Sequence, residues 1–293
     1  MGIICFGEIL YDVYNKNRVI AGAPLNVASI CSALGMNSAI ISALPKNEID
    51  NIPNELKKRK VKIFFNTTKV KVGEAKINLV KNVPTFSIDK KASFDFINSK
   101  NSILQNKKDI NCKFFYFSTL SQRNTISRNT LKRIIKEINS IIVYDINLRP
   151  GIKNWFQIFK YSLKNSHIIK LNIDELNKIK QKGINILKEA FNYKCNYLII
   201  TKGSKGAELY FRNKNKIEKF TIDIKEENKS KNIKLIDTTG CGDAFLAGFL
   251  YAIDRKPKTA LQIAHECAQI VGMEKGAFNN NIKKNIQTKI VRN

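Results

Sequence analysis

Short apolar runs rich in β-branched and aromatic residues alternate along the chain with segments whose apolar residues recur every three or four positions. The short runs are continuously apolar, which is typical of parallel strands buried on both faces. We expect strands at Ile3–Gly7, Ser38–Ala43, Phe114–Ser118, Ile141–Tyr144, Ile168–Leu171 and Tyr197–Thr201. We expect helices at Asn26–Leu34, Ile49–Lys58, Ser127–Ile138, Trp155–Leu163, Asp174–Lys180, Ile184–Phe191, Asp243–Ile253 and Ala260–Met273. This alternation predicts an α/β fold: a doubly wound, mainly parallel sheet flanked by helices.

Two segments depart from this pattern. Residues 9–20, and a stretch over 61–90, alternate apolar and polar side chains, as in Lys69–Val72 and Lys76–Val80. This period of two predicts half-exposed antiparallel strands, for which an ordinary edge hairpin is the simplest arrangement. Because the chain has no repeats and no low-complexity linker, we expect a single domain over residues 1–293.

The composition fits one hydrophobic core without a transmembrane helix. Hydrophobic residues make up 43% of the 293 positions, but no stretch approaches the ~20 apolar residues that a membrane span needs. The N-terminus runs directly into Ile3-Ile4-Cys5-Phe6, without the basic segment and cleavage site of a signal peptide. The six cysteines form no CxxC pair, and the two histidines cannot make a histidine-rich metal site. We therefore expect a cytoplasmic protein with free thiols and no membrane partner.

The formal net charge of +27 raises the question of a nucleic-acid partner. The lysines are spread over the whole chain, and only Lys57-Lys58-Arg59-Lys60 and Lys283-Lys284 form local clusters. Neither cluster is interleaved with a recognition motif. We therefore expect no specific nucleic-acid partner, although a positive field would still attract an anionic nucleotide.

The segment Asp237–Phe245 carries the strongest chemical signal in the chain. Gly240 and Gly242 lie directly before an apolar helical run, so the backbone there can turn its N–H groups toward an anion. Asp243 follows, where a substrate hydroxyl could meet that anion. An anion site beside a carboxylate is what phosphoryl transfer to an alcohol requires. The simpler alternative is a glycine turn in which the aspartate only caps the helix.

Six motifs in one order resemble those of the ribokinase-like (PfkB) carbohydrate kinases. Asp237-Thr-Thr-Gly-Cys-Gly-Asp243 is similar to the family's DTxGAGD signature. The other five are Gly7-Glu8-Ile9-Leu10-Tyr11-Asp12, Ala21-Gly22-Ala23-Pro24-Leu25-Asn26-Val27-Ala28, Asp145-Ile-Asn-Leu-Arg149, Asn172-Ile-Asp-Glu175 and Thr201-Lys-Gly-Ser-Lys-Gly206. The resemblance spans nearly the whole chain. It implies a ribokinase-like fold with a small β-sheet lid from segments at about 9–24 and 61–96, an arrangement through which family members often dimerise.

The resemblance assigns the catalytic centre to the glycine turn. It implies that Asp243 is the base and that the backbone of Gly240, Cys241 and Gly242 holds the γ-phosphate. It also implies that Asp237 helps to build a monovalent-cation site, for example for K⁺. The family usually has Ala where this chain has Cys241. A thiol at a helix N-terminus is either an oxidation-sensitive thiolate or a small inert side chain.

The nucleotide side of the resemblance implies ATP as donor and Mg²⁺ as cofactor. Glu175 would hold Mg²⁺ through water, although Asn-x-x-Glu at a helix start also predicts a capping box. The expected ATP-binding residues are Asn147, Arg149, Asn172, Thr201, Gly203, Gly206 and His265.

The sugar side is expected at Asp12, Gly22, Asn26, Arg123 and Asp243. Ala21 stands where the family has the first glycine of a pair, so a positive φ there would be strained. Phe86 and Phe94 are candidates to cover the sugar, or else core residues. Ser121-Gln122-Arg123 looks like fructokinase-type relatives rather than ribose kinases.

The reading we favour is an ATP-dependent fructokinase that uses Mg²⁺. A second reading keeps the fold and changes the acceptor to ribose, a 2-keto-3-deoxy sugar acid, a nucleoside or a sugar phosphate. A third is a non-catalytic sugar or nucleotide sensor, and a fourth is a basic nucleic-acid binder. A homodimer through the lid is the oligomer that the resemblance suggests.

Overall fold

The computed structural model describes residues 2–14, 17–80, 83–98, 112–223, 235–279, 282–283 and 285–286. Its main element is a nine-stranded sheet with the order β13-β12-β11-β10-β9-β8-β1-β4-β5. The seven strands from β11 to β5 in this order are parallel, while β12 and β13 are antiparallel. The strands are β1 (Gly2–Phe6), β4 (Asn37–Pro45), β5 (Val61–Thr68), β8 (Phe114–Ser118), β9 (Ile141–Asp145), β10 (Ile168–Asn172), β11 (Tyr197–Thr201), β12 (Ala207–Asn213) and β13 (Lys216–Ile222).

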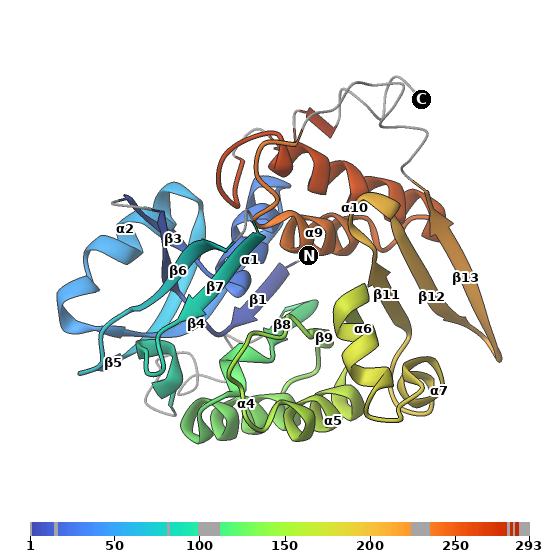
Figure 1. The fold of residues 1–293 in the computed structure, drawn as a ribbon, viewed down its shortest axis with the longest axis horizontal. Helices are drawn as coiled ribbons and strands as arrows, with labels where there is room; N and C mark the ends of the chain where they lie inside the picture. The colour runs from blue at the N-terminus through green and yellow to red at the C-terminus, as the bar shows by residue number, and fades with distance from the viewer. Residues whose placement is uncertain are drawn as a thin grey trace.

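Helices cover both faces of this sheet, with α9 and α10 on one side and α4 and α5 on the other (Figure 1). The first layer packs into one hydrophobic cluster and comprises α1 (Ala23–Ala33), α2 (Asn51–Lys58), α9 (Cys241–Ala252) and α10 (Pro257–Gly272). The second layer packs into another cluster and comprises α4 (Thr125–Glu137), α5 (Trp155–Asn165), α6 (Ile173–Lys180) and α7 (Ile186–Phe191). The expected doubly wound α/β fold is confirmed.

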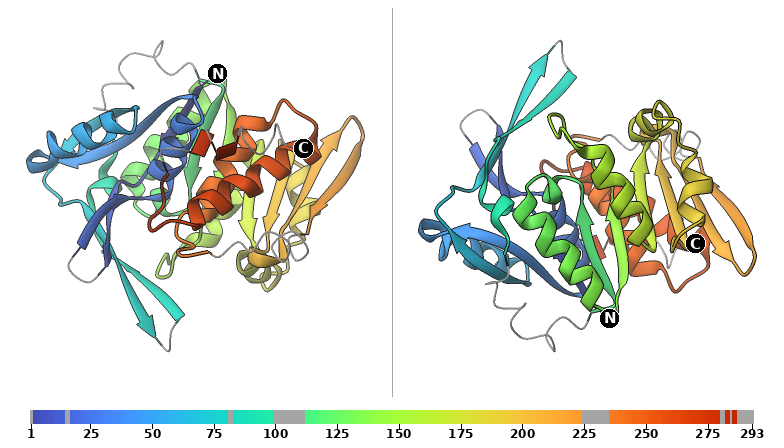
Figure 2. Two further views of the ribbon diagram at one scale, coloured as in Figure 1. Left: turned by 90° about the horizontal axis from the view of Figure 1, so that it is seen from above. Right: turned by 90° about the horizontal axis from the view of Figure 1, so that it is seen from below.

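A second sheet of four strands lies beside the first, in the order β3-β2-β6-β7. It consists of β2 (Leu10–Tyr14), β3 (Asn17–Ala21), β6 (Gly73–Val80) and β7 (Val83–Ile88). Leu10, Ala21 and Ala75 anchor it to a small cluster that includes Phe94 and Leu120. The β6–β7 hairpin projects from the body at the end opposite β12 and β13 (Figure 2).

The expected lid segment 61–96 is divided between the two sheets. Residues 61–68 form β5, which pairs in parallel with β4 at the edge of the large sheet. This part of the prediction was wrong, because alternating burial is equally typical of an edge strand with one face exposed. β6 and β7, within residues 73–88, belong to the small sheet, where β6 pairs antiparallel with β7 and parallel with β2.

Parallel strands bring the carboxyl ends of β1, β8, β9, β10 and β11 to one edge of the large sheet. Ligand sites of open α/β sheets lie at this edge. Four of the six sequence motifs begin at or just after the ends of β1, β9, β10 and β11, and the N-terminus of α9 lies close to Lys170 on β10. No helix in the described part of the chain is long and apolar enough to span a membrane.

Candidate active site

The chain enters α9 through a turn that requires glycine. Gly240 has φ 76°, in the left-handed region, and a Cβ at this position would lie 2.5 Å from the Cβ of Ala277. Residues 240–243 are all partly exposed, whereas the helix is buried from Ala244 onward. The residues of the turn are therefore partly accessible to solvent.

Three backbone amides of this turn are available to an anion. Within the described residues, no acceptor takes the N–H groups of Gly240, Gly242 or Asp243. The Cys241 N–H instead donates to the carbonyl of Thr238 at 3.2 Å. The sequence named the amides of Gly240, Cys241 and Gly242 as anion donors, whereas the amides that find no acceptor among the described residues are those of Gly240, Gly242 and Asp243.

Cys241 does not have the environment of a reactive thiolate. Burial, followed by the charges of Asp237 and Asp243, raises the pKa of its thiol to about 11. The thiol donates weakly to the Asp237 carbonyl oxygen, with 3.9 Å between sulfur and oxygen. Burial and the two neighbouring carboxylates therefore favour the second alternative for Cys241, a small inert side chain.

Asp243 is held by a residue from the other end of the chain. The Nδ2 of Asn26, on α1, donates to Oδ2 of Asp243 at 2.8 Å. Burial raises the pKa of Asp243 to about 6, against the lowering effect of Lys170. A carboxylate with this pKa can accept a proton near neutral pH, as a general base must.

Strand β2 of the small sheet places Asp12 near Asp243. Burial raises the pKa of Asp12 to about 6, and the charges of Arg149 and Asp243 both act on it. Gly22 has φ 123°, and a Cβ there would collide with the carbonyl of Glu8. Ala21 is buried on β3 and lies outside the positive-φ residues, so the expected strain at this position is absent.

Glu8 also lies near Asp243, although the sequence analysis gave it no role. Its side chain is 1% exposed, and the only side chain that donates to it in the described structure is Ser118, at 3.4 Å. Burial raises the pKa of Glu8 to about 7, with contributions from Arg149 and Asp243. Its position directly after a buried strand, within the Gly-Glu motif, was the signal that could have identified it.

Asn172 and Glu175 form the capping box at the start of α6. The Glu175 N–H donates to Oδ1 of Asn172 at 2.9 Å, and the Asn172 N–H donates to Oε2 of Glu175 at 2.8 Å. The other carboxylate oxygen of Glu175 accepts the Leu148 N–H at 2.7 Å. Glu175 thus fixes the loop that carries Asn147, at φ 37°, and Arg149.

Thr201 is the last residue of β11, and Gly203 and Gly206 follow it at the sheet edge. Gly203 (φ 59°) and Gly206 (φ 92°) both have left-handed backbone, and a Cβ at Gly203 would meet no atom within 4 Å. The Thr201 hydroxyl donates to the Leu171 carbonyl at 3.4 Å. His265 lies on α10 and is only 6% exposed, so a contact with adenine would need this side chain to be uncovered.

Asp237 ties the loop before α9 to the chain after α10. Its two oxygens accept the N–H groups of Thr239, at 2.9 Å, and Gly276, at 3.1 Å. Burial opposes ionisation, but these amides outweigh it and lower the pKa of Asp237. The described residues contain no group of three or more potential His, Cys, Asp or Glu metal ligands.

Arg123 is committed to a protein partner. Its Nε and Nη2 donate to the two oxygens of Asp95, both at 2.7 Å, and its guanidinium lies 4.7 Å from the ring centre of Phe94. Phe94 is fully buried, so it is a core residue and does not cover a sugar. The side chain of Phe86 lies outside the described part of the structure.

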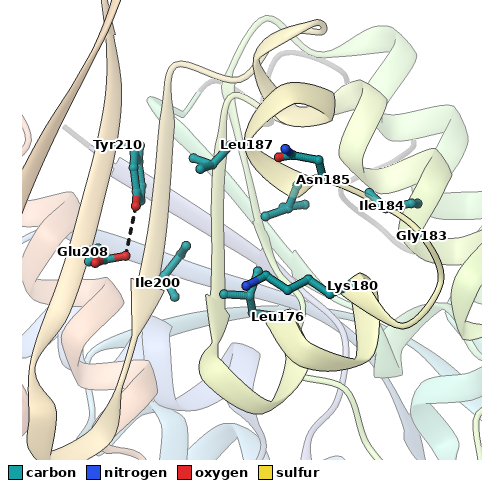
Figure 3. Close-up of a pocket in the computed structure, with 10 residues that line it drawn as sticks. Leu176, Lys180, Gly183, Ile184, Asn185, Leu187, Ile200, Glu208 and Tyr210 are labelled. Atoms are coloured by element: carbon teal, nitrogen blue, oxygen red, sulfur yellow. Dashed lines mark hydrogen bonds between the residues drawn. The ribbon is translucent and has the colours of Figure 1, made fainter.

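A pocket of about 570 Å³ lies elsewhere, on the sheet face covered by α6 and α7 (Figure 3). Its lining is mainly aliphatic, with Glu208 accepting a hydrogen bond from the Tyr210 hydroxyl at 3.0 Å. It contains none of the candidate site residues. The candidate site residues at the α9 turn and the adjoining strand ends lie outside this pocket.

Comparisons with known proteins agree with this geometry. The pfkB family carbohydrate kinase profile matches residues 3–284. A putative sugar kinase from Pyrococcus horikoshii is 29% identical over 257 residues, which is 83% of this chain and 76% of the relative. Probable fructokinase-5 from Arabidopsis thaliana is 25% identical over 314 residues, covering 94% of this chain and 93% of the relative.

A solved fructokinase with bound ATP, from Xylella fastidiosa, superposes with a TM-score of 0.81 at 17% identity, over 99% of this chain and 98% of its own. This likeness shows that the ribokinase-like fold extends over the described structure. The chain therefore belongs to the pfkB family of carbohydrate kinases, enzymes that transfer a phosphoryl group to a hydroxyl acceptor.

Proposed function

We propose that this sugar kinase uses ATP to phosphorylate D-fructose, giving a fructose phosphate and ADP. The observation that carries the transfer chemistry is the Asn26–Asp243 hydrogen bond of 2.8 Å, directly beside amides that find no acceptor in the described part of the chain. The choice of fructose rests on the relatives named fructokinase and on Ser121-Gln122-Arg123. Ser121 and Gln122 are buried, so this segment would act on specificity by shaping the site and not by touching the sugar.

Asp243 would act as general base. Its carboxylate would take the proton of the acceptor hydroxyl as the oxygen–phosphorus bond forms and ADP departs with the electron pair of the broken bond. Asn26 would keep the carboxylate aimed at the acceptor. Asp12, on the small sheet, would accept hydrogen bonds from other sugar hydroxyls, and the small sheet would close over the sugar as a lid.

The glycine turn and Arg149 would receive the transferring phosphoryl group. The free amides of Gly240, Gly242 and Asp243 offer preorganised donors where negative charge develops. The charge of Arg149 already acts on Glu8, Asp12 and Asp243, so a phosphoryl group between base and sugar would lie within its reach. The loops with Thr201, Gly203 and Gly206 would hold the remaining nucleotide.

Glu175 is a suitable residue to hold Mg²⁺ through water. Each of its oxygens accepts one backbone N–H, which leaves further lone pairs for metal-bound water. The cation would neutralise phosphate charge during transfer. A monovalent cation bound near Asp237 would order the loop before α9.

An acceptor panel tests this proposal. ADP release would be measured by a coupled assay with D-fructose, ribose, a 2-keto-3-deoxy sugar acid, a nucleoside and a sugar phosphate. We expect D-fructose to give the highest kcat/KM. A higher value for another acceptor would reject fructose but keep the kinase. Thermal stabilisation by a sugar without any turnover would instead favour the sensor reading.

A further inference from the structure

A buried ion pair lies beneath the first turn of α9. Lys170, in the otherwise apolar part of β10, is 7% exposed, and Asp145 on β9 is fully buried. The Lys170 Nζ donates to Oδ2 of Asp145 at 2.8 Å. Burial alone would favour a neutral amine, but Asp145 outweighs it and the pKa of Lys170 lies above its usual range. The side chain is therefore an ammonium.

Stability alone gives no reason for this pair. Apolar residues of similar volume in place of a buried ion pair are often neutral or stabilising. In addition, a cation near the N-terminus of a helix opposes the positive end of the helix dipole. The Lys170–Asp145 pair therefore costs stability. We look for its role in the chemistry of the glycine turn that lies above it.

The ammonium lies directly against the glycine turn. A Cβ on Gly242 would lie 3.1 Å from the Lys170 Nζ, so this glycine leaves room for the lysine as well as for an anion. The next residue is Asp243, and of all side chains it is Lys170 that most strongly favours its carboxylate form. Asp145 acts on Asp243 in the opposite direction.

Several other groups face Asp243 from the surrounding elements. The charged and phenolic ones are Glu8, Asp12, Tyr116, Asp145, Arg149 and Lys170. The thiols of Cys5 and Cys241 also lie near, and burial raises the pKa of both. Among the described residues, three carboxyls therefore surround Asp243 and two cations offset them, so the removal of one cation changes the balance substantially.

We propose that Lys170, oriented by Asp145, is a positioning residue of the transfer reaction that keeps Asp243 in its carboxylate form and supports the glycine turn from below. The inference rests on the proposed role of Asp243 as base. During transfer, the acceptor O–H proton passes to Asp243, the new oxygen–phosphorus bond forms, and the bond to ADP breaks. Lys170 keeps all its protons throughout.

The test compares the pH dependence of kcat, at saturating ATP and D-fructose, for the wild type, Lys170→Met and Asp145→Asn. Lys170→Met should move the acid limb up by about one pH unit, because Asp243 loses its strongest cation. Asp145→Asn should move it down, because an opposing anion is removed. A purely structural role would lower kcat in both variants and leave the acid limb of the pH profile where it is in the wild type. That result would overturn the inference, and so would acid limbs that move in the same direction in both variants.

A double variant keeps the test conclusive if Lys170→Met misfolds. If Lys170→Met does not fold, Asp145→Asn is compared with Lys170→Met/Asp145→Asn, in which no buried charge is left unpaired. The double variant should have its acid limb about one pH unit above that of Asp145→Asn. Asp243→Asn distinguishes a failure of the proposed base from a failure of the role of Lys170 alone. Turnover in that variant would remove both the base and this inference, whereas an inactive Asp243→Asn with unmoved limbs in the other variants would remove only the role of Lys170.

Discussion

Gly22 has a backbone conformation, φ 123°, that residues with a side chain rarely adopt, and the Glu8 carbonyl lies where its Cβ would be. Gly22→Ala should lower the free energy of unfolding by at least about 1–3 kcal/mol, from strain alone. Gly183→Ala is the matched control, because Gly183 also has positive φ (74°) but open space around it. Urea denaturation should show a smaller loss for Gly183→Ala, of about 1 kcal/mol. Equal losses would contradict the collision with Glu8.

Glu8 links stability to pH. Burial raises its pKa from 4.5 to about 7 in the folded state, so between these values the folded protein binds more protons than the unfolded chain. Its contribution to stability is therefore lost as pH rises through this window. From about pH 5 to about pH 7.5, the wild type should lose on the order of 2 kcal/mol relative to Glu8→Gln in urea denaturation.

Glu208→Gln is the control for this pH effect. Although burial opposes it, hydrogen bonds from Lys202, Lys219 and Tyr210 lower the pKa of Glu208 to about 2. Its contribution is therefore constant over the same pH range, and Glu208→Gln should track the wild type. A Glu8→Gln variant that also tracked the wild type would contradict a raised pKa at Glu8.

At the scale of elements, the start of α6 connects a helix cap to the site loop. Glu175→Ala removes the hydrogen bonds to Asn172 and Leu148, so unfolding should become easier by on the order of 2 kcal/mol. Asp174→Ala changes an exposed carboxylate on the same helical turn and should cost less than about 1 kcal/mol. Chemical denaturation of the two variants, side by side, measures the difference, and equal effects would show that the capping box contributes nothing special.

The sequence predicted most elements because their hydrophobic patterns are local. All six expected strands and eight expected helices are present, and α1 begins three residues earlier than expected, with Pro24 in its first turn. The hairpin of β12 and β13 was missed, because charged residues interrupt both Ala207–Asn213 and Lys216–Ile222. β5 was assigned to the lid because which sheet a strand joins depends on long-range pairing and not on its own pattern.

Candidate site residues were predictable where the backbone conformation requires a particular residue type. Gly240, Gly242 and the following aspartate identified the α9 turn, and Gly240 has the positive φ that such a turn requires. Asn26 and Asp243 were both expected on the sugar side, but the hydrogen bond between them was not predicted. Glu8 and Lys170 were not identified, because one charged residue in or beside an apolar strand does not reveal what lies opposite. The partner of Arg123 was equally hidden, since Asp95 reaches it only in the folded chain.

For the whole molecule, the charge of +27 should limit stability through self-repulsion. Salt screens such repulsion, so Tm should rise by roughly 2–4 °C between about 20 mM and about 300 mM NaCl. An uncharged osmolyte at equal osmolarity separates screening from solvent exclusion. A Tm that stays level or falls with salt would mean that the charges are already compensated within the fold.

The central claim is that Asp243 takes the proton of the sugar hydroxyl. The most direct measurement is kcat for D-fructose phosphorylation by Asp243→Asn and by the wild type, together with the Kd for ATP of each. We predict that kcat falls by ~10²–10⁴-fold while the Kd changes by less than about threefold, because the amide keeps the shape of the turn but cannot accept the proton. Turnover within about tenfold of the wild type would contradict the account.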